Sequence, residues 1–359
     1  VKLSKDANLP DQDKPRVLIL GQCHAEEIYG VEIAMEIINQ FLHPEQYSNN
    51  RPYLQRGLAD SELWIIPTYN PEGLRVVHGY FEDGNEIQDV TYRKNKRDTN
   101  NNNIFDYENG IGGDTDGVDL NRNYDFNWIF GDELYSTDLG CGANPSYIAN
   151  YDYYRGPYPF SETEVVTIRD FVLQKNFVTS IAYHSSRSGC VAEKVIYPWE
   201  WDVNKKSPDF DIISRLGFEM SQLLPKEAES GFYASASSIS RRGNAHDWIY
   251  ANTGCIQYLV EVATSNMQPD SEELIEDTIL RNLQGAYHLF KRAAGINYPT
   301  GPDKYQIKGL IYDSITNDPL ENVELIVEEM SGTILEPRLS DSFGRYHRLL
   351  YFDSFKIYS

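Results

Sequence analysis

Short apolar runs alternate with helical periodicity along residues 1–295 of this 359-residue chain. The apolar runs predict buried strands at 16–22, at 62–73 (ending in an Asn-Pro turn), at 177–184 and at 255–262. Apolar residues at helical spacing predict helices at 28–42, 165–174 and 273–295, the last one ended by Gly295. Because strands and helices alternate, we expect an α/β fold with a mixed, largely parallel twisted sheet flanked by helices.

The pattern changes beyond residue 298. Residues 299–304 form a linker that contains Pro and Gly, and residues 305–359 alternate apolar and polar positions between turn sequences such as NDP and DSFG. The sequence therefore predicts two domains, the α/β domain at 1–298 and a small all-β sandwich at 305–359. The second segment is short for a sandwich, so one interpretation is that its last strand is absent.

Composition narrows the partners and the chemistry. The formal net charge of −22 disfavours binding to nucleic acid or to an anionic membrane, and no apolar stretch has transmembrane length. The four cysteines, at positions 23, 141, 190 and 255, form no CxxC pair, which disfavours a thiolate metal site and is compatible with zero, one or two disulfides. The chain starts at Val1, and we interpret it as a mature or trimmed product.

Residue types that bind metals lie at the ends of three predicted strands. His24 and Glu27 follow the first strand, and His184 and Glu261 lie at the ends of two later ones. Strand ends of an α/β sheet meet at one edge, where two His and one Glu would suit a hydrolytic zinc site. A further carboxylate held off the metal would serve as a general base. Singly, each residue has an ordinary structural explanation, but together those explanations require a coincidence.

Two further segments contain candidate cations for substrate binding. Asn121-Arg122 lies between a short apolar stretch and aromatic residues, and Arg93 lies in the basic stretch YRKNKR. A guanidinium group matches a carboxylate through two parallel hydrogen bonds, and a cation can also stabilise an oxyanion. The alternative explanation for both segments is ordinary surface charge.

The order and spacing of these residues resemble the zinc metallocarboxypeptidases of the funnelin, or carboxypeptidase A-like, family (peptidase family M14). The resemblance covers about residues 1–295, and the tract around YRKNKR is most similar to bacterial carboxypeptidase T-like members. It rests on HxxE (24–27), NPEG (70–73), YRKNKR (92–97), DLNRNY (119–124), RGPYPFSETE (155–164), YH (183–184), DWIY (247–250) and VEV (260–262). The segment with IKGLIYDSITNDPLENVELIV and DSFGRY resembles the transthyretin-like, or carboxypeptidase regulatory-like, domain that follows many such catalytic domains.

The resemblance implies the metal site and its chemistry. His24, Glu27 and His184 would bind one zinc ion per chain. Glu261 would act as the general base that activates water and then as the acid that protonates the leaving amine.

The resemblance also implies how substrate is held. Arg93 would stabilise the oxyanion, and Asn121 and Arg122 would bind the terminal carboxylate of the substrate. His246, directly before the Asp of the DW pair, would lie at the base of the specificity pocket. A charged His246 would select acidic C-terminal residues, whereas a neutral one would line a mixed pocket. The family's substrate-capping Tyr would fall at Ile239, so that role has no residue here.

The Asn-rich stretch DTNNNNIFDYEN (98–109) matches part of a calcium-binding loop. Its candidate ligands at positions 1, 3, 5, 7 and 9 of such a loop are Asp98, Asn100, Asn102, Ile104 (through its backbone carbonyl) and Asp106. Asn103 replaces the usual Gly, and Asn109 replaces the final acid, which Asp114 or Asp116 would have to supply. The alternative is a solvated insertion without an ion.

The leading prediction is a secreted or periplasmic zinc exopeptidase that hydrolyses the C-terminal peptide bond of peptides and proteins. One alternative is a relative that cleaves γ-linked bonds of peptidoglycan stem peptides. The other is a catalytically inactive, calcium-braced binding protein. We expect a monomer whose partners are peptide or protein C-termini, with no nucleic acid and no transmembrane segment.

Overall fold

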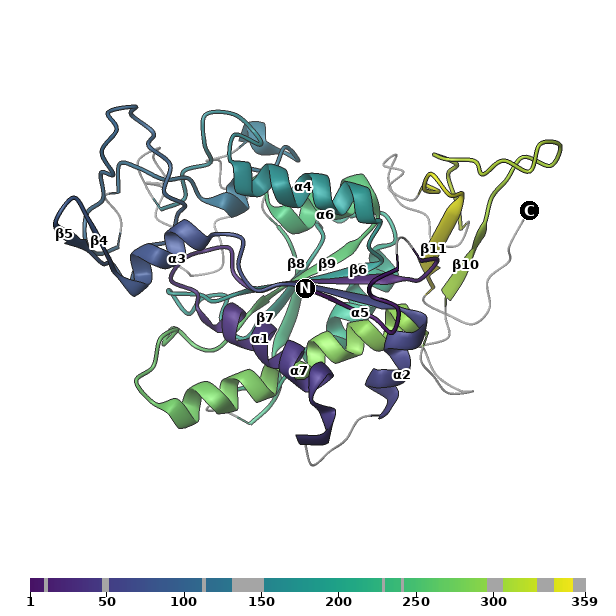
Figure 1. The fold of residues 1–359 in the computed structure, drawn as a ribbon, viewed down its shortest axis with the longest axis horizontal. Helices are drawn as coiled ribbons and strands as arrows, with labels where there is room; N and C mark the ends of the chain where they lie inside the picture. Colours follow the sequence, from purple (N-terminus) through teal and green to yellow (C-terminus); the bar gives the residue numbers. More distant parts are fainter. Residues whose placement is uncertain are drawn as a thin grey trace.

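The computed structural model describes residues 1–9, 12–46, 52–111, 114–130, 152–227, 230–239, 242–295, 306–327 and 339–350. Within these residues the chain forms a seven-stranded mixed sheet with the order β1-β3-β2-β6-β9-β7-β8 (Figure 1). Its strands are β1 (Lys2–Leu3), β2 (Arg16–Leu20), β3 (Glu62–Ile66), β6 (Thr179–His184), β7 (Lys194–Tyr197), β8 (Ala234–Ser237) and β9 (Ile256–Glu261). β3, β2, β6 and β9 are parallel, and β1 and β7 join them antiparallel, which confirms the predicted largely parallel sheet.

Helices cover both faces of the sheet (Figure 1). The helices α1 (Tyr29–Leu42), α5 (Phe210–Ser221) and α7 (Glu272–Ala294) pack on one face, and α4 (Thr163–Lys175) and α6 (Ala245–Thr253) pack on the other. Successive side chains of β2 divide between the two cores, because Val17 belongs to the first and Leu18 to the second. All residues of β2 and β6 are buried, as expected for central parallel strands.

The predicted helices at 28–42, 165–174 and 273–295 correspond to α1, α4 and α7, and Gly295 caps α7 with a left-handed φ of 61°. The strand predicted at 62–73 is wrong in its second half, because β3 ends at Ile66. There Asn70 caps a helix that begins at Pro71, and its Oδ1 accepts a hydrogen bond from Gly73 N at 3.1 Å. The remaining elements are α2 (Pro52–Asp60), α3 (Pro71–His78), β4 (Tyr80–Glu82), β5 (Asn85–Ile87), η1 (Pro44–Gln46), η2 (Leu120–Arg122) and η3 (Trp128–Phe130).

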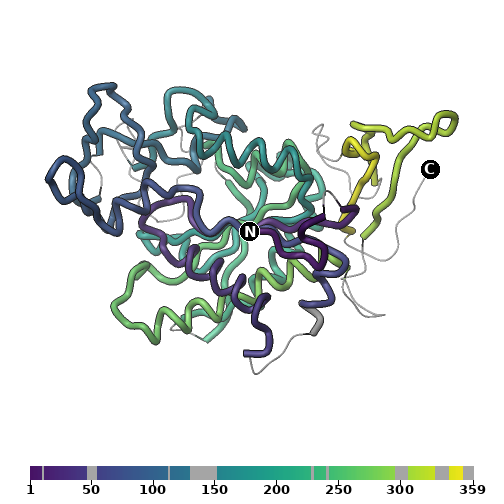
Figure 2. Tube along the Cα trace, viewed as in Figure 1, coloured from purple at the N-terminus to yellow at the C-terminus, as the bar shows by residue number. Residues whose placement is uncertain are grey.

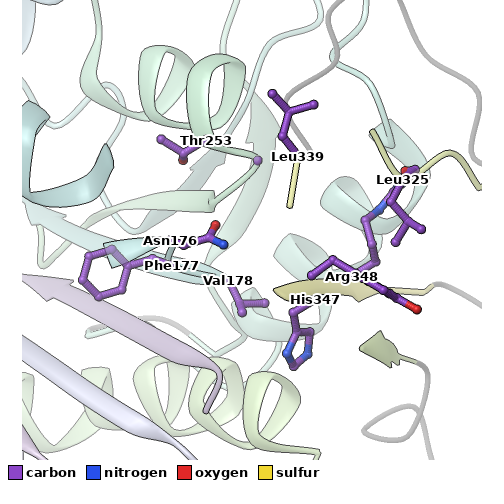
Figure 3. A pocket seen from close by; sticks show the side chains of 10 residues that line it. Asn176, Phe177, Val178, Thr253, Leu325, Leu339, His347 and Arg348 are labelled. Atoms are coloured by element: carbon purple, nitrogen blue, oxygen red, sulfur yellow. The ribbon is translucent and has the colours of Figure 1, made fainter. Parts of the chain in front are cut away.

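The C-terminal segment packs at the edge of the sheet where β6 and β9 begin (Figures 1 and 2). Its strands β10 (Gln306–Leu310) and β11 (Arg345–Leu349) pair antiparallel. A small pocket separates β11 from the starts of β6 and β9 (Figure 3). Beside it, Arg348 forms a buried ion pair with Asp209 at 3.0 Å. The linker at 299–304 lies outside the described residues, and the complete sandwich stays a prediction. No helix in the described part of the chain is long and apolar enough to cross a membrane.

Candidate metal centre and active site

Close packing of two glycines places the HxxE segment at the edge of the sheet. A Cβ atom on Gly30 would lie 1.6 Å from the carbonyl oxygen of Gly21, so α1 can begin this close to the end of β2 only with glycine there. The intervening turn is also tied to the Arg93 segment, because Ala25 N donates to Arg93 O at 2.9 Å. His24 and Glu27 are thereby fixed beyond the carboxyl end of β2.

The register between β6 and β9 brings the other two residues to the same edge. His184 and Glu261 are the last residues of these parallel strands and lie opposite each other. The backbone N of Ser185 donates to Glu27 Oε2 at 3.0 Å, which connects the end of β6 to the HxxE segment. Three strand ends therefore meet, as the sequence predicted.

The three candidate ligands converge on one point. His24 Nδ1 lies 2.8 Å from Glu27 Oε1 and 3.0 Å from His184 Nδ1, and His184 Nδ1 lies 3.0 Å from Glu27 Oε2. All three side chains are buried. A tetrahedral ion with ligands at ~2.0–2.1 Å spaces the ligand atoms ~3.3 Å apart, so a small outward shift would admit zinc.

The charges in this cluster also favour a cation. Burial and Arg93 would lower the pKa of His24, but Glu27 and Asp119 outweigh them and hold it well above its usual value. Burial would raise the pKa of Glu27, but the two imidazoles hold it well below its usual value. Burial lowers the pKa of His184, which favours the neutral form of its ring. The cluster thus draws one positive charge to the point where the donor atoms meet, and the residues present fit a zinc ion.

Asp119 is a part of this site that the sequence reasoning did not single out. Its Oδ1 lies 3.0 Å from His24 Nε2, and its Oδ2 accepts from Arg93 Nε at 3.1 Å. A carboxylate on the outer nitrogen of a metal-binding His fixes the tautomer and the ring orientation. The signal was present in DLNRNY, since a predicted His ligand calls for such a partner, but the sequence does not say which acid supplies it.

Glu261 is half-buried at the end of β9 and has one buried, unsatisfied oxygen. Its Oε2 finds no hydrogen-bond partner within the described part of the chain. Burial, and next the negative charge of Glu27, raise the pKa of Glu261 to about 8. A half-buried carboxyl group that can hold or release a proton near neutral pH is suited to general acid–base chemistry.

Arg93 lies against the ligands, and a second arginine lies behind it. Arg93 Nη1 donates to Glu27 Oε1 at 3.1 Å. Its distance to Glu26 Oε1 is 3.7 Å, whereas Arg187 Nη2 donates to that oxygen at 2.6 Å. The buried Glu26 is thus paired mainly with Arg187. The sequence reasoning missed both residues of this pair.

Asn121 and Arg122 lie in the short helix η2, next to the start of α6. Asn121 Oδ1 accepts from Ala245 N at 2.9 Å, and Arg122 Nη1 donates to Asn244 Oδ1 at 3.2 Å. His246 follows in the first turn of α6 and is buried. Burial, and next His184 and Arg122, lower the pKa of His246 to about 3. This favours the neutral alternative for His246 over the charged one.

The position of the family's capping Tyr is occupied by the half-buried Ile239. The nearby Tyr233 is buried in the core, and its hydroxyl accepts from Asn282 Nδ2 and Ala263 N, both at 3.2 Å. Tyr233 is therefore a packing residue and unsuited to swing over a substrate.

The Asn-rich loop is arranged differently from the strand-end cluster. Asp98 accepts from the backbone N of Asn102 and Asn103, and the side-chain amides of Asn100 and Asn102 donate to Asp106 Oδ2 at 2.8 Å and 2.6 Å. Asn103 has a left-handed φ of 61°, the backbone conformation for which a calcium loop uses Gly.

The two acids that follow the loop are buried and bound to its backbone. Asp116 accepts from the backbone N of Thr99 and of Asp106, both at 2.8 Å, and Asp114 accepts from Glu108 N at 3.0 Å. Burial raises the pKa of Asp114 to about 6. These acids brace the loop from within.

The cysteines divide into two kinds. Cys23 and Cys255 are buried free thiols, and Cys190 is disulfide-bonded. Cys141 lies outside the described residues.

Comparison with known proteins identifies the family. The family model described as zinc carboxypeptidase matches residues 1–282. The chain belongs to the zinc carboxypeptidase family. The carboxypeptidase A of Helicoverpa armigera shares the fold, with a TM-score of 0.58 at 20% identity over 82% of this chain and 64% of that one.

Two relatives show the range of proteins that this chain resembles. Carboxypeptidase B of Astacus astacus is 30% identical over 189 residues, which are 52% of this chain and 49% of the relative. An inactive metallocarboxypeptidase of Talaromyces marneffei is 23% identical over 268 residues, which are 67% of this chain and 38% of the relative. The chain therefore spans half or less of the length of these two relatives.

Proposed function

We propose that this chain is a metallocarboxypeptidase that removes C-terminal residues from peptides and proteins. The carrying observation is that His24, Glu27 and His184 converge at one edge of the sheet, with Glu261 opposite His184. A bound zinc ion would polarise the scissile carbonyl group and lower the pKa of a water molecule toward about 7.

The residues of the chain then divide the work. Glu261 takes a proton from the attacking water and passes it to the leaving amine, a transfer supported by its buried, unpartnered Oε2. Arg93 stabilises the oxyanion, and Asn121 and Arg122 bind the terminal carboxylate through N–H donors. His246, neutral in its buried position, lines a pocket for apolar or mixed side chains.

Three finer features belong to the same proposal. The protein works in an extracytoplasmic compartment, which the disulfide at Cys190 supports. The loop at 98–106 binds calcium, and the left-handed Asn103 supports this. The segment at 305–359 is a transthyretin-like domain, in keeping with the antiparallel pairing of β10 and β11.

The complete set of ligands and the presence of Glu261 argue against an inactive binding protein, although one relative is named inactive. No feature of the described residues specifically favours the cleavage of γ-linked stem peptides.

The test combines metal analysis with peptide trimming. Purified protein should contain one zinc per chain, and mass spectrometry should show stepwise loss of C-terminal residues that stops on chelation and returns with zinc. A γ-linked stem peptide and a peptide with an amidated C-terminus serve as comparison substrates. Zinc-loaded protein that does not trim α-linked peptides would contradict the proposal, and trimming of the γ-linked peptide alone would favour that alternative.

A further inference from the structure

Two arginines that the proposed function assigns to substrate lie against one aromatic ring. The guanidinium carbon of Arg93 is 4.8 Å from the ring centroid of Tyr153, and that of Arg122 is 5.7 Å from the same centroid. Both distances fall within the ~6 Å range of cation–π attraction. We propose that Tyr153 is a positioning residue that orients both guanidinium groups toward a bound peptide C-terminus. This inference rests on the proposed function of the site.

The segment that carries Tyr153 is anchored on both sides of the ring. The preceding residue, Asp152, is buried and accepts a hydrogen bond from Arg187 Nη1. The following residue, Tyr154, accepts from Asp119 N at 2.8 Å through its carbonyl oxygen. Since Asp119 also contacts His24, the ring is placed relative to the metal ligands as well as to the arginines.

The anchoring arginine is itself bound to the metal site. Arg187 Nη2 donates to Glu26 Oε1 at 2.6 Å and to Thr91 O at 2.9 Å. Arg187 therefore connects the Tyr153 segment to Glu26, which precedes the ligand Glu27, and to Thr91, which lies two residues before Arg93. This contact gives the buried Glu26 a role next to the ligand Glu27. Glu26 binds Arg187, and Arg187 in turn binds Asp152.

An aromatic ring is a suitable partner for cations that must bind substrate. A carboxylate engages the N–H groups in the guanidinium plane, whereas a ring attracts the face of the plane and occupies none of the N–H donors. A peptide C-terminus presents two such oxygen groups one residue apart, the scissile carbonyl and the terminal carboxylate. Arg93 and Arg122 beside one ring form a matched pair for these two groups.

The test measures peptide binding and turnover in zinc-loaded Tyr153→Leu and Tyr153→Phe proteins. The Leu variant should raise KM about tenfold, within the range expected for loss of a cation–π contact, and should also lower kcat, because Arg93 is proposed to stabilise the oxyanion. The Phe variant keeps the ring and should behave like wild type. Tyr158→Leu is the matched control, because Tyr158 is an exposed tyrosine of the same segment.

Binding to the Glu261→Gln protein separates this inference from the proposed activity. A peptide with a free C-terminal carboxylate should bind about tenfold more weakly when Tyr153→Leu is added, and the amidated peptide should show a smaller change, because it keeps only the scissile carbonyl group. In an Arg122→Met background the effect of Tyr153→Leu should shrink, because residues that act together are not additive.

Three results would overturn the role of Tyr153. The first is an unchanged KM and affinity in Tyr153→Leu. The second is an equal loss for free and amidated peptides, and the third is a Phe variant as weak as the Leu variant. If wild type binds the free carboxylate through Tyr153 but releases no residue, the proposed activity fails while this inference stands.

Discussion

Two regions of the molecule contain candidate metal ligands, and they are built in opposite ways. At the strand ends, His24 and Glu27 meet His184, which lies 160 positions from His24 in the sequence, and all three are only 2–3% exposed. In the Asn-rich loop the candidate ligands are close in sequence, and the exposed Asn100 and Asn102 are bonded to Asp106 within the loop itself.

This difference determines how strongly the structure of each region depends on a bound ion. The strand-end cluster is buried, and its charged groups are partnered by one another, so removing one ligand leaves buried groups without compensation. The loop satisfies polar groups of Asp98, Asn100, Asn102 and Asp106 by internal hydrogen bonds. An ion bound there would add modest stability. We therefore expect effects of very different size from equivalent changes in the two regions.

The largest effect is expected from His184→Ala. Removing one of three protein ligands should abolish stoichiometric zinc and all peptide trimming, because structural and catalytic zinc sites depend on a complete ligand set. Metal content by mass spectrometry and activity against a chromogenic C-terminal peptide measure this. His43→Ala is the matched control, since His43 is half exposed and lies away from the cluster. Full zinc content in His184→Ala would refute the ligand assignment.

Next in size is Glu261→Gln, which should separate metal binding from turnover. Because Glu261 is proposed as the general base, kcat should fall by about 10²–10⁴-fold while zinc content and peptide affinity persist. Steady-state kinetics and metal analysis on the same sample measure both. If the Gln variant loses its zinc, Glu261 is a ligand, and if it keeps normal turnover, another group takes the proton.

A smaller effect is expected from Asp119→Asn, which removes no metal ligand but alters the outer contact of His24 and the contact with Arg93. Loss of the carboxylate partner of a metal-bound His typically lowers metal affinity by about 10–100-fold. Competition with a chromogenic chelator gives the zinc Kd. Asp125→Asn is the control, because Asp125 is exposed in the same part of the chain. Equal zinc affinity in the two variants would show that Asp119 only braces Arg93.

The zinc-free protein should reveal the raised pKa of Glu261 as a pH-dependent stability. The folded chain holds a proton on Glu261 up to about pH 8, whereas an unfolded chain releases it near its ordinary pKa of 4.5. The contribution of protonated Glu261 to the free energy of unfolding is therefore fully present below pH 4.5, and it is lost as the pH rises toward about 8. Urea unfolding of the zinc-free protein should show a pH slope that Glu261→Gln reduces and that the exposed control Glu276→Gln leaves unchanged. Equal slopes in all three would mean an ordinary pKa.

The strand ends were predictable because local apolar runs predict strands and because such ends meet at one edge of a sheet. Local sequence patterns did not predict which side chains far apart in the sequence would pair. Asp119 reaches His24 across 95 positions, and Arg187 reaches Glu26 across 161. The short strands β7 and β8 were also missed, because the runs KVIY and ASAS are too brief for periodicity to show.

The error at Asn70-Pro71 has a different origin. Asn-Pro is a strong turn signal, but Asn is equally suited to cap a helix whose first residue is Pro. Long-range contacts favour the helix cap over the simple turn, because Asn70 Nδ2 donates to Cys23 O at 2.9 Å and to Lys94 O at 3.1 Å. Those long-range contacts fix the side chain where α3 begins, and they also join the HxxE segment to the Arg93 segment.

The smallest effect is expected at the Asn-rich loop. Calcium that binds only the folded chain stabilises it by mass action, by about 2.7 kcal/mol at a concentration 100 times the Kd. For a chain longer than 250 residues this amounts to a rise in Tm of about 2–5 °C. Thermal unfolding of zinc-loaded protein, with and without millimolar calcium, should show that rise. Peptide KM should change little, since the loop is only indirectly connected to Arg93.

Substitution of the first position of the loop gives the decisive comparison. Asp98→Ala should remove the calcium-dependent rise in Tm, while the exposed control Asp270→Ala should keep it. Asp98→Ala should also lower Tm slightly without calcium, because Asp98 accepts hydrogen bonds from the backbone N of Asn102 and Asn103. The two changes in Tm thus measure separately the stability that comes from hydrogen bonds within the loop and the stability that comes from bound calcium. If calcium leaves the Tm of wild type unchanged while Asp98→Ala lowers it, the loop is held by its own hydrogen bonds alone, and the strand-end cluster is the metal site of the two.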